Sequence, residues 1–496
     1  MINRSMALNE EINAQGVHFL GDFEGNCGIS RAGRDLIEVV RSLCVPIELL
    51  ELPLSPERNA ELAGTSVSDR DFAAPRSRLS IAHCNADTLA YVARRLPQSL
   101  FEDRRIVGVW YWEAQNLPES HRHGFDWVDE VWVTSRFIAE NLSRYSPVPV
   151  RHFPPLMKLA EPPARLDLPP ELANDRFVFL FCFDYRSQPA RKNPEGVCEA
   201  FVRAFPQPLP DGPLCVIKSF GGRKSYTLDH LELRLRYRRR PDILFLDEWF
   251  TESQRDSLMS RADCYVSLHR AEGLGLTLLE SMALGKPCIA TAYSGNVDFM
   301  SPENSWLIPA KLQPVGPGIA PFLPNDLWAD PDLNCAARAM NEVFENRDEA
   351  VRRGNLGRET VRTRHSIEAV GARVAVLLEG SLRSPARSKP IPASEGALLK
   401  GVSARARAFE CLKESRRVME EISKLGEPGI LGRDAARRIR VLSETLRIQQ
   451  RALSETLKEV GEIRQSLKQL EMKSKELLQL DPSRLLKIID RLVDET

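Results

Sequence analysis

Seven consecutive apolar residues, from Phe177 to Phe183, restrict the fold of this chain more than any other feature of its sequence. A strand that is apolar at every position cannot leave one face in water, so both of its faces must be covered. Strands of this kind belong to parallel sheets that are covered by helices on both sides. The run therefore predicts an α/β domain in this part of the chain.

The residues around this run alternate between strand-like and helix-like patterns, as in successive βαβ units. Strands are expected at 214–218, 243–246, 264–268 and 288–292. Helices are expected at 194–205, 251–261 and 277–285. An earlier alternation has strands at 16–21, 45–50, 79–84, 105–111 and 130–134, with a helix over 32–43 and a loop over 57–78. The sequence thus predicts two Rossmann-like α/β domains in series, facing each other across a cleft.

The chain of 496 residues is too long for a single core, which agrees with two domains and an appendage. Prolines at 154–155 and 162–163 interrupt the pattern, and a long broken helix near 331–383 closes the globular part. We therefore expect four regions: an N-terminal Rossmann-like domain at 1–160, a second Rossmann-like domain at 161–383, a Pro- and Ser-rich linker at 384–398, and a helical region at 399–496.

A heptad pattern runs through the helical region from 439 to 477. With Ile439 as position a, nine of the twelve a and d positions are apolar over six heptads. This period favours a coiled coil that forms a homo-oligomer or binds a partner of the same pathway. The alternative is a long amphipathic helix packed on the body of the protein.

The charge balance and the lengths of the apolar runs exclude some partners and compartments. Lys and Arg number 68, as do Asp and Glu, so nucleic acid is not an expected partner. The first residues lack the apolar core of a signal peptide, and no apolar run approaches the ~20 residues that span a bilayer. We expect a cytoplasmic protein without a transmembrane segment. The basic stretch Arg234–Arg240 is typical of a solvated helix face; the alternative is contact with phosphates or with the inner face of a membrane.

The segment from Leu268 to Ala290 combines a strand, a glycine-containing turn and a helix. The positive end of such a helix and the close backbone approach that glycine permits suit a diphosphate. Two carboxylates, Glu272 in the turn and Glu280 in the helix, suit the hydroxyl groups of sugar and ribose, which donate hydrogen bonds to them. A sugar joined to a nucleoside diphosphate, the donor in a sugar transfer, would therefore bind here. The residues of this segment expected to bind it are Gly273, Leu274, Gly275, Leu276 and Glu280.

At these residues the sequence resembles family 4 of the retaining glycosyltransferases, which have the GT-B fold and belong to the glycosyl transferases group 1. The signature is E-x7-E, a helix, and a G-x-P entry into the next strand, and this chain has all three parts. The resemblance implies that Glu272 lies by the donor sugar and that Glu280 binds the ribose. The family also has an Arg and a Lys six positions apart after an earlier strand, which are Arg186 and Lys192 here.

Those two cations can stabilise the departing nucleoside diphosphate without a metal ion, because fixed positive charges offset the negative charge that develops. No metal or other cofactor is expected. The tripeptides Asp69–Asp71 and Asp330–Asp332 have the D-x-D pattern of metal-dependent glycosyltransferases, but neither follows an evident buried strand, so both are interpreted as chance occurrences in loops.

The N-terminal domain has weaker signals. Gly25 and Gly28 occupy the place of the family's glycine-rich loop, which faces the donor phosphates; a simple turn is the alternative. The family's usual histidine motif is absent, and the nearest candidates are Glu113, after the aromatic residues 110–112, and His83, at the end of an earlier strand. A histidine at a strand end is more often structural. These aromatics either stack on a sugar or belong to the core. In the second domain, Lys218 and Glu248 follow strands where nucleotide-facing loops fall, whereas Ser294–Asn296 departs from the family's glycine pair.

The sequence therefore predicts a metal-independent hexosyltransferase of the mannose or glucose type. The donor would be a UDP- or GDP-linked sugar, the acceptor a glycan or lipid-linked glycan, and the anomeric configuration would be retained. An alternative from another class is a non-catalytic scaffold that organises polysaccharide assembly through its coiled coil. A scaffold has no need of Arg186, Lys192, Glu272 and Glu280 together, which favours the enzyme. Phosphorylase-like chemistry would need a cofactor lysine motif that we do not find.

Overall fold

The structure is a computed structural model that describes residues 16–389 except 26, 53–76, 94–95, 160, 162–166, 222–226, 318 and 320. All of the described residues belong to one compact unit, which extends from Met1 to Ile391. The predicted coiled coil at 439–477 and most of the predicted loop at 57–78 lie outside the described residues.

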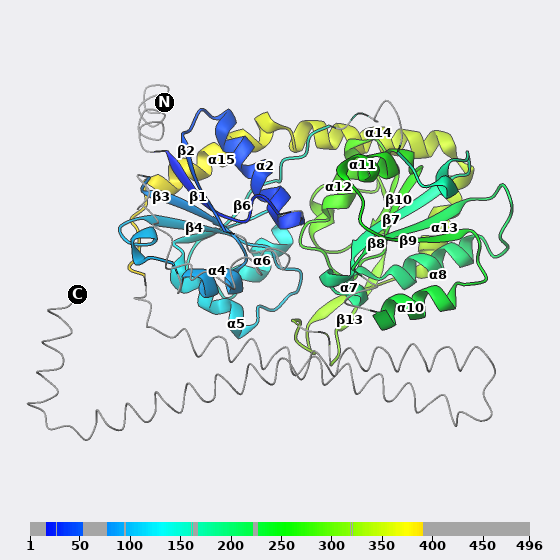
Figure 1. The fold of residues 1–496 in the computed structure, drawn as a ribbon, viewed down its shortest axis with the longest axis horizontal. Coiled ribbons are helices and arrows are strands. Elements are labelled where there is room, and N and C mark those ends of the chain that lie inside the picture. Colours follow the sequence, from blue (N-terminus) through cyan, green and yellow to red (C-terminus); the bar gives the residue numbers. More distant parts are fainter. Residues whose placement is uncertain are drawn as a thin grey trace, which may run out of the picture. The chain divides into compact units, whose positions relative to one another are not determined.

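The first sheet is parallel throughout, with the order β2-β1-β3-β4-β5-β6. Its strands are β1 (Val17–Gly21), β2 (Ile47–Glu51), β3 (Leu79–His83), β4 (Arg105–Val109), β5 (Glu130–Val133) and β6 (Val150–His152). Five of these strands lie within about two residues of the prediction; the three-residue β6 is too short to show a pattern. The helix α2 (Gly28–Ser42) covers one face, and α4 (Ala86–Ala93), α5 (Glu119–Arg122) and α6 (Arg136–Ser143) cover the other (Figure 1).

The second sheet is also parallel, with the order β12-β11-β10-β7-β8-β9. Its strands are β7 (Val178–Asp184), β8 (Leu214–Phe220), β9 (Ile243–Asp247), β10 (Cys264–Ser267), β11 (Cys288–Thr291) and β12 (Trp306–Ile308). The apolar run forms β7 near the middle of the sheet, and its residues 178–181 are buried, which confirms the predicted cover on both faces. A separate antiparallel pair consists of β13 (Ala310–Pro314) and β14 (Leu327–Pro331).

Helices cover both faces of this second sheet (Figure 1). One face has α8 (Pro194–Ala204), α10 (Thr227–Arg236) and α13 (Leu333–Glu345), and the other has α11 (Glu252–Arg261), α12 (Leu276–Ala283) and α14 (Arg347–Arg364). Sequence signals explain several boundaries. Thr251 and Gln254 form a capping box at the start of α11. Asn193 caps α8, whose first position is Pro194.

The order of the strands determines where a ligand can bind. From β7 the chain proceeds outward through β8 and β9, then returns to place β10 on the opposite side of β7. From these two neighbouring strands the chain continues in opposite directions along the sheet, and ligands of such sheets bind beyond the carboxyl ends of the strands at this point. The first sheet reverses in the same way between β1 and β3. These two reversal points are where the predicted site residues should meet.

The broken helix predicted near 331–383 is three helices, α13, α14 and α15 (Ile367–Leu382). Asp332 caps the first of these helices. The two breaks occur at Asn346 and Ser366, whose side chains accept backbone hydrogen bonds and so begin α14 and α15. The last helix returns to the first sheet, where Val370 and Val374 are buried in the cluster that contains residues of β1 and α2. Residues 367–382 therefore pack with the N-terminal core, although the sequence prediction grouped them with the second domain.

We predict that Gly354→Ala destabilises the protein, because α14 passes close to the chain that follows α12. A Cβ atom at position 354 would lie 2.2 Å from the Gly285 carbonyl oxygen. The free energy of unfolding should fall by about 1–3 kcal/mol, as for overpacking elsewhere. Gly380→Ala on α15 is a matched control with no neighbouring atom within 4 Å, and its helix propensity should raise stability by ~0.5–1 kcal/mol. Urea unfolding would measure both; equal effects would contradict the close approach.

Candidate functional site

Two loops meet at the carboxyl ends of β7 and β10. The first contains the one-turn helix α7 (Pro189–Lys192), and the second leads from β10 to α12. Asn193 joins them: its Nδ2 donates to the Leu268 carbonyl at 2.7 Å, while its Oδ1 accepts from the Gly196 N–H at 3.1 Å. It adopts the left-handed conformation, with φ of 57°, which asparagine tolerates better than most residues. The basic residues just before Asn193 are thereby held beside Glu272.

Glu272 forms ion pairs with two basic side chains. Lys192 Nζ pairs with Oε1, and Arg191 Nη1 lies 3.3 Å from Oε2. The three side chains are buried or nearly so, with exposed fractions of 12%, 18% and 4% for Glu272, Lys192 and Arg191. Burial alone would raise the pKa of Glu272, but Lys192 and Arg191 outweigh it and lower the pKa to about 2. The carboxylate is therefore anionic at neutral pH, and it accepts hydrogen bonds rather than delivering protons.

The loop Ser294–Asn296 supports Glu272 through its backbone. The Ser294 hydroxyl accepts from the Glu272 N–H at 2.8 Å, and the Gly295 N–H donates to the Glu272 carbonyl at 3.0 Å. A Cβ atom at Gly295 would lie 2.3 Å from the Gly273 carbonyl oxygen, so only glycine permits this approach. The buried His269 completes the support, with Nε2 3.1 Å from Asn296 Oδ1. The departure from the family pattern at 294–296 thus has a structural role beneath the turn at residues 272–275.

The turn before α12 presents a bare helix N-terminus. Gly275 is the N-cap residue, with φ of 87°, and provides no side-chain cap. The first N–H groups of α12 and the positive end of its dipole are therefore available to an anion. Gly28, from the first domain, faces this turn, because a Cβ atom there would lie 4.0 Å from Leu276 Cδ2. The structure thus brings together two of the predicted donor-binding residues, Gly28 and Leu276, from opposite domains.

Glu280 also has a partner in the first domain. Its Oε1 forms a hydrogen-bonded ion pair with Nη1 of Arg31 on α2. Arg34, one helical turn later, donates from Nη1 to the carbonyls of Phe23 and Gly25 at 2.8 and 2.9 Å and so fixes the glycine loop. The Gly25 N–H donates to Asp22 Oδ1 at 2.8 Å. Sequence reasoning missed Arg31 and Arg34; their position in the first turns after the glycine loop was the available signal.

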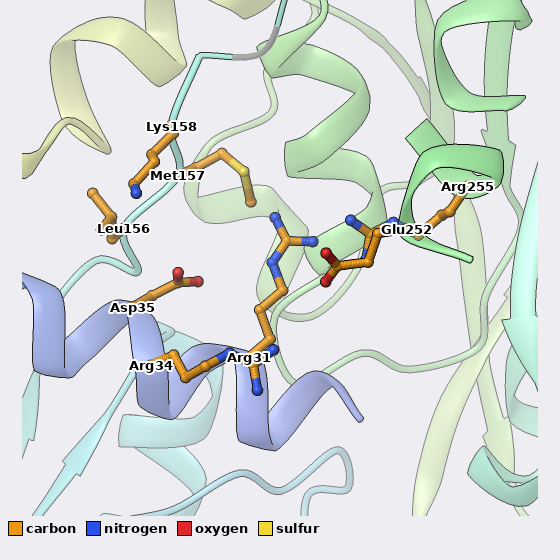
Figure 2. Close-up of a pocket in the computed structure, with 8 residues that line it drawn as sticks. All are labelled: Arg31, Arg34, Asp35, Leu156, Met157, Lys158, Glu252 and Arg255. Carbon is orange, nitrogen blue, oxygen red and sulfur yellow. The ribbon is translucent and has the colours of Figure 1, made fainter. Parts of the chain in front are cut away.

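A cavity of about 240 Å³ adjoins this ion pair. Figure 2 shows the eight residues that line it: Arg31, Arg34, Asp35, Leu156, Met157, Lys158, Glu252 and Arg255. They come from α2, from the strand connection near 156–158 and from the start of α11. Burial raises the pKa of Asp35, and the nearby Arg31 opposes that change. Because Glu272 and Lys192 do not line this cavity, it flanks the Glu280 side of the site rather than the cluster around Glu272.

Arg186 and Glu248 follow β7 and β9, whereas Lys218, which was predicted to follow a strand, lies within β8 because that strand extends to Phe220. Arg186 Nη2 donates to Asp184 Oδ2 at 2.8 Å, and its guanidinium carbon lies 5.0 Å from the centre of the Phe220 ring. Lys218 Nζ donates to the Glu248 carbonyl at 2.7 Å. The structure therefore joins Lys218 with Glu248. Arg186 pairs with Asp184, whereas the two cations that contact Glu272 are Lys192 and Arg191.

Glu113 follows β4 and reaches the second domain. Its Oε1 lies 3.6 Å from Arg191 Nη2, and its side chain is 30% exposed. Trp110 and Trp112, which precede it, are buried in the core, which confirms the core alternative for those aromatics. The structure thus places Glu113 beside Glu272, as a catalytic candidate would require. Arg191, which connects the two, was missed, although it directly precedes Lys192 in the sequence.

Two other sequence signals have structural explanations. Within the basic stretch, Arg236 pairs with Glu195 and Arg240 pairs with Asp242, as for a helix end that is paired within the protein. Asp330 lies in β14 rather than in a loop, and Asp332 caps α13; Asp69–Asp71 lies outside the described residues.

Within the described ranges, no three His, Cys, Asp or Glu side chains are placed to hold a metal ion. No described helix is both long and apolar enough to cross a membrane.

Comparison with known proteins identifies part of the chain. Residues 186–314 match the family described as Glycosyl transferases group 1, which confirms the predicted domain for this segment. No curated protein matches the sequence. Among solved structures, sucrose-phosphate synthase from Thermosynechococcus elongatus is 18% identical and covers 74% of this chain and 99% of its own, with a TM-score of 0.53. A glycosyltransferase from Rickettsia africae is 13% identical with the same coverage and a TM-score of 0.52.

A third structure, Anabaena Alr3699/HepE in complex with UDP and glucose, is 13% identical, covers 74% of this chain and 100% of its own, and has a TM-score of 0.48. The first two structures, with TM-scores above 0.5, align with this chain over nearly their whole length. The described part of this chain accordingly has the GT-B arrangement of two parallel-sheet, Rossmann-like domains.

We predict that Glu272→Gln weakens the acid dependence of stability. The pKa of Glu272 falls from its ordinary value of 4.5 to about 2 on folding. The ionised group should thus contribute on the order of 3 kcal/mol above pH 4.5, and this contribution is lost as the pH falls toward 2. The difference in free energy of unfolding between wild type and variant should therefore shrink between pH 5 and pH 3. Urea unfolding would measure it, with the exposed Glu345→Gln as control; a constant difference would contradict the lowered pKa.

Proposed function

We propose that this chain is a retaining, metal-independent hexosyltransferase that transfers a sugar of the mannose or glucose type from a UDP- or GDP-linked donor. One observation carries the proposal. At the reversal point of the second sheet, Lys192 and Glu272 are paired beside the uncapped N-terminus of α12. A cation, a helix N-terminus and a fixed carboxylate are what a diphosphate joined to a sugar needs. The match of residues 186–314 to the glycosyl transferases group 1 supports the same chemistry.

The donor's diphosphate would lie between the glycine loop at Gly25–Gly28, the turn Gly273–Leu276 and the cations Lys192 and Arg186. Lys192 needs little rearrangement for this role, because its side chain already lies beyond the carboxyl end of β7 and is 18% exposed. Arg186 would have to exchange its carboxylate partner Asp184 for phosphate oxygens. Positive charge in this place stabilises the diphosphate as it departs, which is the role that a metal ion has in other glycosyltransferases.

Glu280 would accept hydrogen bonds from the ribose of the donor. Arg31 pairs with this carboxylate, so the nucleoside must displace or share that ion pair. Lys218 and Glu248, at the ends of β8 and β9, lie where they could contact the nucleoside. These assignments follow the strand order of the sheet, since ligands of such sheets bind beyond the carboxyl ends of the strands.

The transfer would occur on one face of the sugar. The bond from the anomeric carbon to the β-phosphate oxygen breaks, the acceptor oxygen forms a new bond to the same carbon, and the acceptor proton passes to the departing phosphate. Glu272 is a fixed anion with two basic partners, so it suits the binding of sugar hydroxyls and the electrostatic stabilisation of a cationic sugar ring. The acceptor would be a glycan or lipid-linked glycan that approaches from the N-terminal domain, on the cytoplasmic side.

A thermal-shift screen tests the donor site. We expect one of UDP, GDP or ADP, or its common sugar conjugates, to raise the melting temperature of the full chain, because a ligand that binds the folded state stabilises it. The increase should be unchanged by EDTA and should be smaller in Glu280→Ala. The exposed Glu345→Ala on α13 is the matched control and should respond as wild type does. Loss of the shift with EDTA would overturn metal independence; no shift with any nucleotide would favour a non-catalytic scaffold.

The predicted coiled coil at 439–477 gives a separate prediction. We propose that it forms a homo-oligomer or binds a pathway partner and is not needed for the donor site. Deletion of residues 395–496 should lower the oligomeric state, measured by light scattering, and leave the nucleotide-induced shift within about 1 °C, because the described site residues all precede residue 395. A truncated protein of unchanged oligomeric state that no longer binds nucleotide would contradict both parts.

A further inference from the structure

Arg191 is a buried charge at the centre of the site that neither the sequence motif nor the proposed phosphate ligands include. It lies on the one-turn helix α7, and its side chain is only 4% exposed. Removing a guanidinium from water costs several kcal/mol unless the group is paired and hydrogen-bonded. The contacts that offset this cost therefore show what the residue does.

All three nitrogens of the Arg191 guanidinium have protein partners. Nη1 donates to the Ala271 carbonyl at 2.7 Å and lies 3.3 Å from Glu272 Oε2, and Nε donates to the Ser187 carbonyl at 3.2 Å. Nη2 lies 3.6 Å from Glu113 Oε1. Burial alone would lower the pKa of Arg191, but Glu113 and Glu272 outweigh it and raise the pKa. With these partners, the side chain has little capacity left to bind a phosphate group.

The two carboxylates that Arg191 contacts come from different domains. Glu113 follows β4 of the first sheet, and Glu272 follows β10 of the second. Glu113 lies against the turn that leads into α12, because a Cβ atom at Gly273 would lie 3.6 Å from Glu113 Cγ. A second link lies alongside, where the Ser135 hydroxyl donates to the Gly273 carbonyl at 2.6 Å. Only the planar, forked guanidinium of arginine can reach both carboxylates at once; a lysine ammonium is a single point charge.

We propose that Arg191 is a positioning residue that orients Glu272 and holds Glu113 against the turn at Gly273. The sugar of the donor would then bind between two carboxylates, one from each domain. This inference rests on the proposed function and deepens it. Glu113 keeps 30% of its side chain exposed and offers its other oxygen to a ligand. The two carboxylates would accept hydrogen bonds from the hydroxyls of the sugar ring, whereas Lys192 and Arg186 would bind the diphosphate.

The experiment compares two ligands on the full chain by calorimetric titration. One is the nucleoside diphosphate that stabilises wild type most in the screen, and the other is its hexose conjugate. For Arg191→Met, we expect the affinity for the diphosphate to stay within about twofold, while the ratio of conjugate to diphosphate affinity falls about tenfold. Glu113→Gln should lower the same ratio. The double variant should have the same affinity ratio as Arg191→Met alone, because both changes disrupt the same contact between Arg191 and Glu113.

The conservative variant separates charge from geometry. Arg191→Lys keeps the positive charge but cannot bridge both carboxylates, so it should lower the ratio as Arg191→Met does and leave diphosphate affinity unchanged. If Arg191→Met fails to fold, Arg191→Lys and Glu113→Gln provide the same comparison. A matched loss of affinity for both ligands would show that Arg191 is a phosphate ligand, and unchanged affinities in folded variants would show a purely structural role. Either outcome overturns this inference alone, whereas a wild type that binds no nucleotide overturns the proposed function.

Discussion

The cover that β7 requires on both faces constrains the rest of the described structure. Because the strand is apolar throughout, it lies inside a parallel sheet with β8 on one side and β10 on the other, and helices cover both faces. Parallel neighbours must be connected by crossovers, so the chain leaves β7 in one direction and returns on its other side. The position of Lys192 and Glu272 beyond the carboxyl ends of β7 and β10 is a geometric consequence of this arrangement.

The buried charge of Glu272 is compensated by its neighbours. Glu272 is paired with Lys192 and Arg191, its N–H donates to Ser294 and its carbonyl accepts from Gly295. Burial favours the neutral form of a carboxyl group, yet the two cations keep it ionised. A carboxylate held in this way needs little reorganisation when a ligand arrives, which is the condition under which electrostatic stabilisation is most effective. The same pairing makes the stability of the protein fall in acid, because the contribution of ionised Glu272 is lost as the pH falls toward 2.

Three of the contacts between the two domains differ in their relation to a ligand. Helix α15 packs on the first sheet, Arg191 links Glu113 to Glu272, and Arg31 pairs with Glu280. The first contact is apolar and independent of any ligand. The other two involve carboxylates that are proposed to bind the donor, so donor binding would exchange contacts between the domains for contacts with the ligand. The strength of donor binding should therefore reflect a difference between two sets of hydrogen bonds rather than one set alone.

The sequence by itself determined the two parallel α/β domains, because apolar periodicity and glycine turns are local signals. It also determined the segment around Glu272 and Glu280, whose residues are close in the chain. It could not show that Arg191, rather than Arg186, would pair with Glu272, or that Glu113 and Arg31 would reach the other domain. Nor could it show that α15 returns to the N-terminal core. These features depend on which distant residues the crossovers bring together, and on where a buried charge finds its compensation, and only tertiary packing decides both.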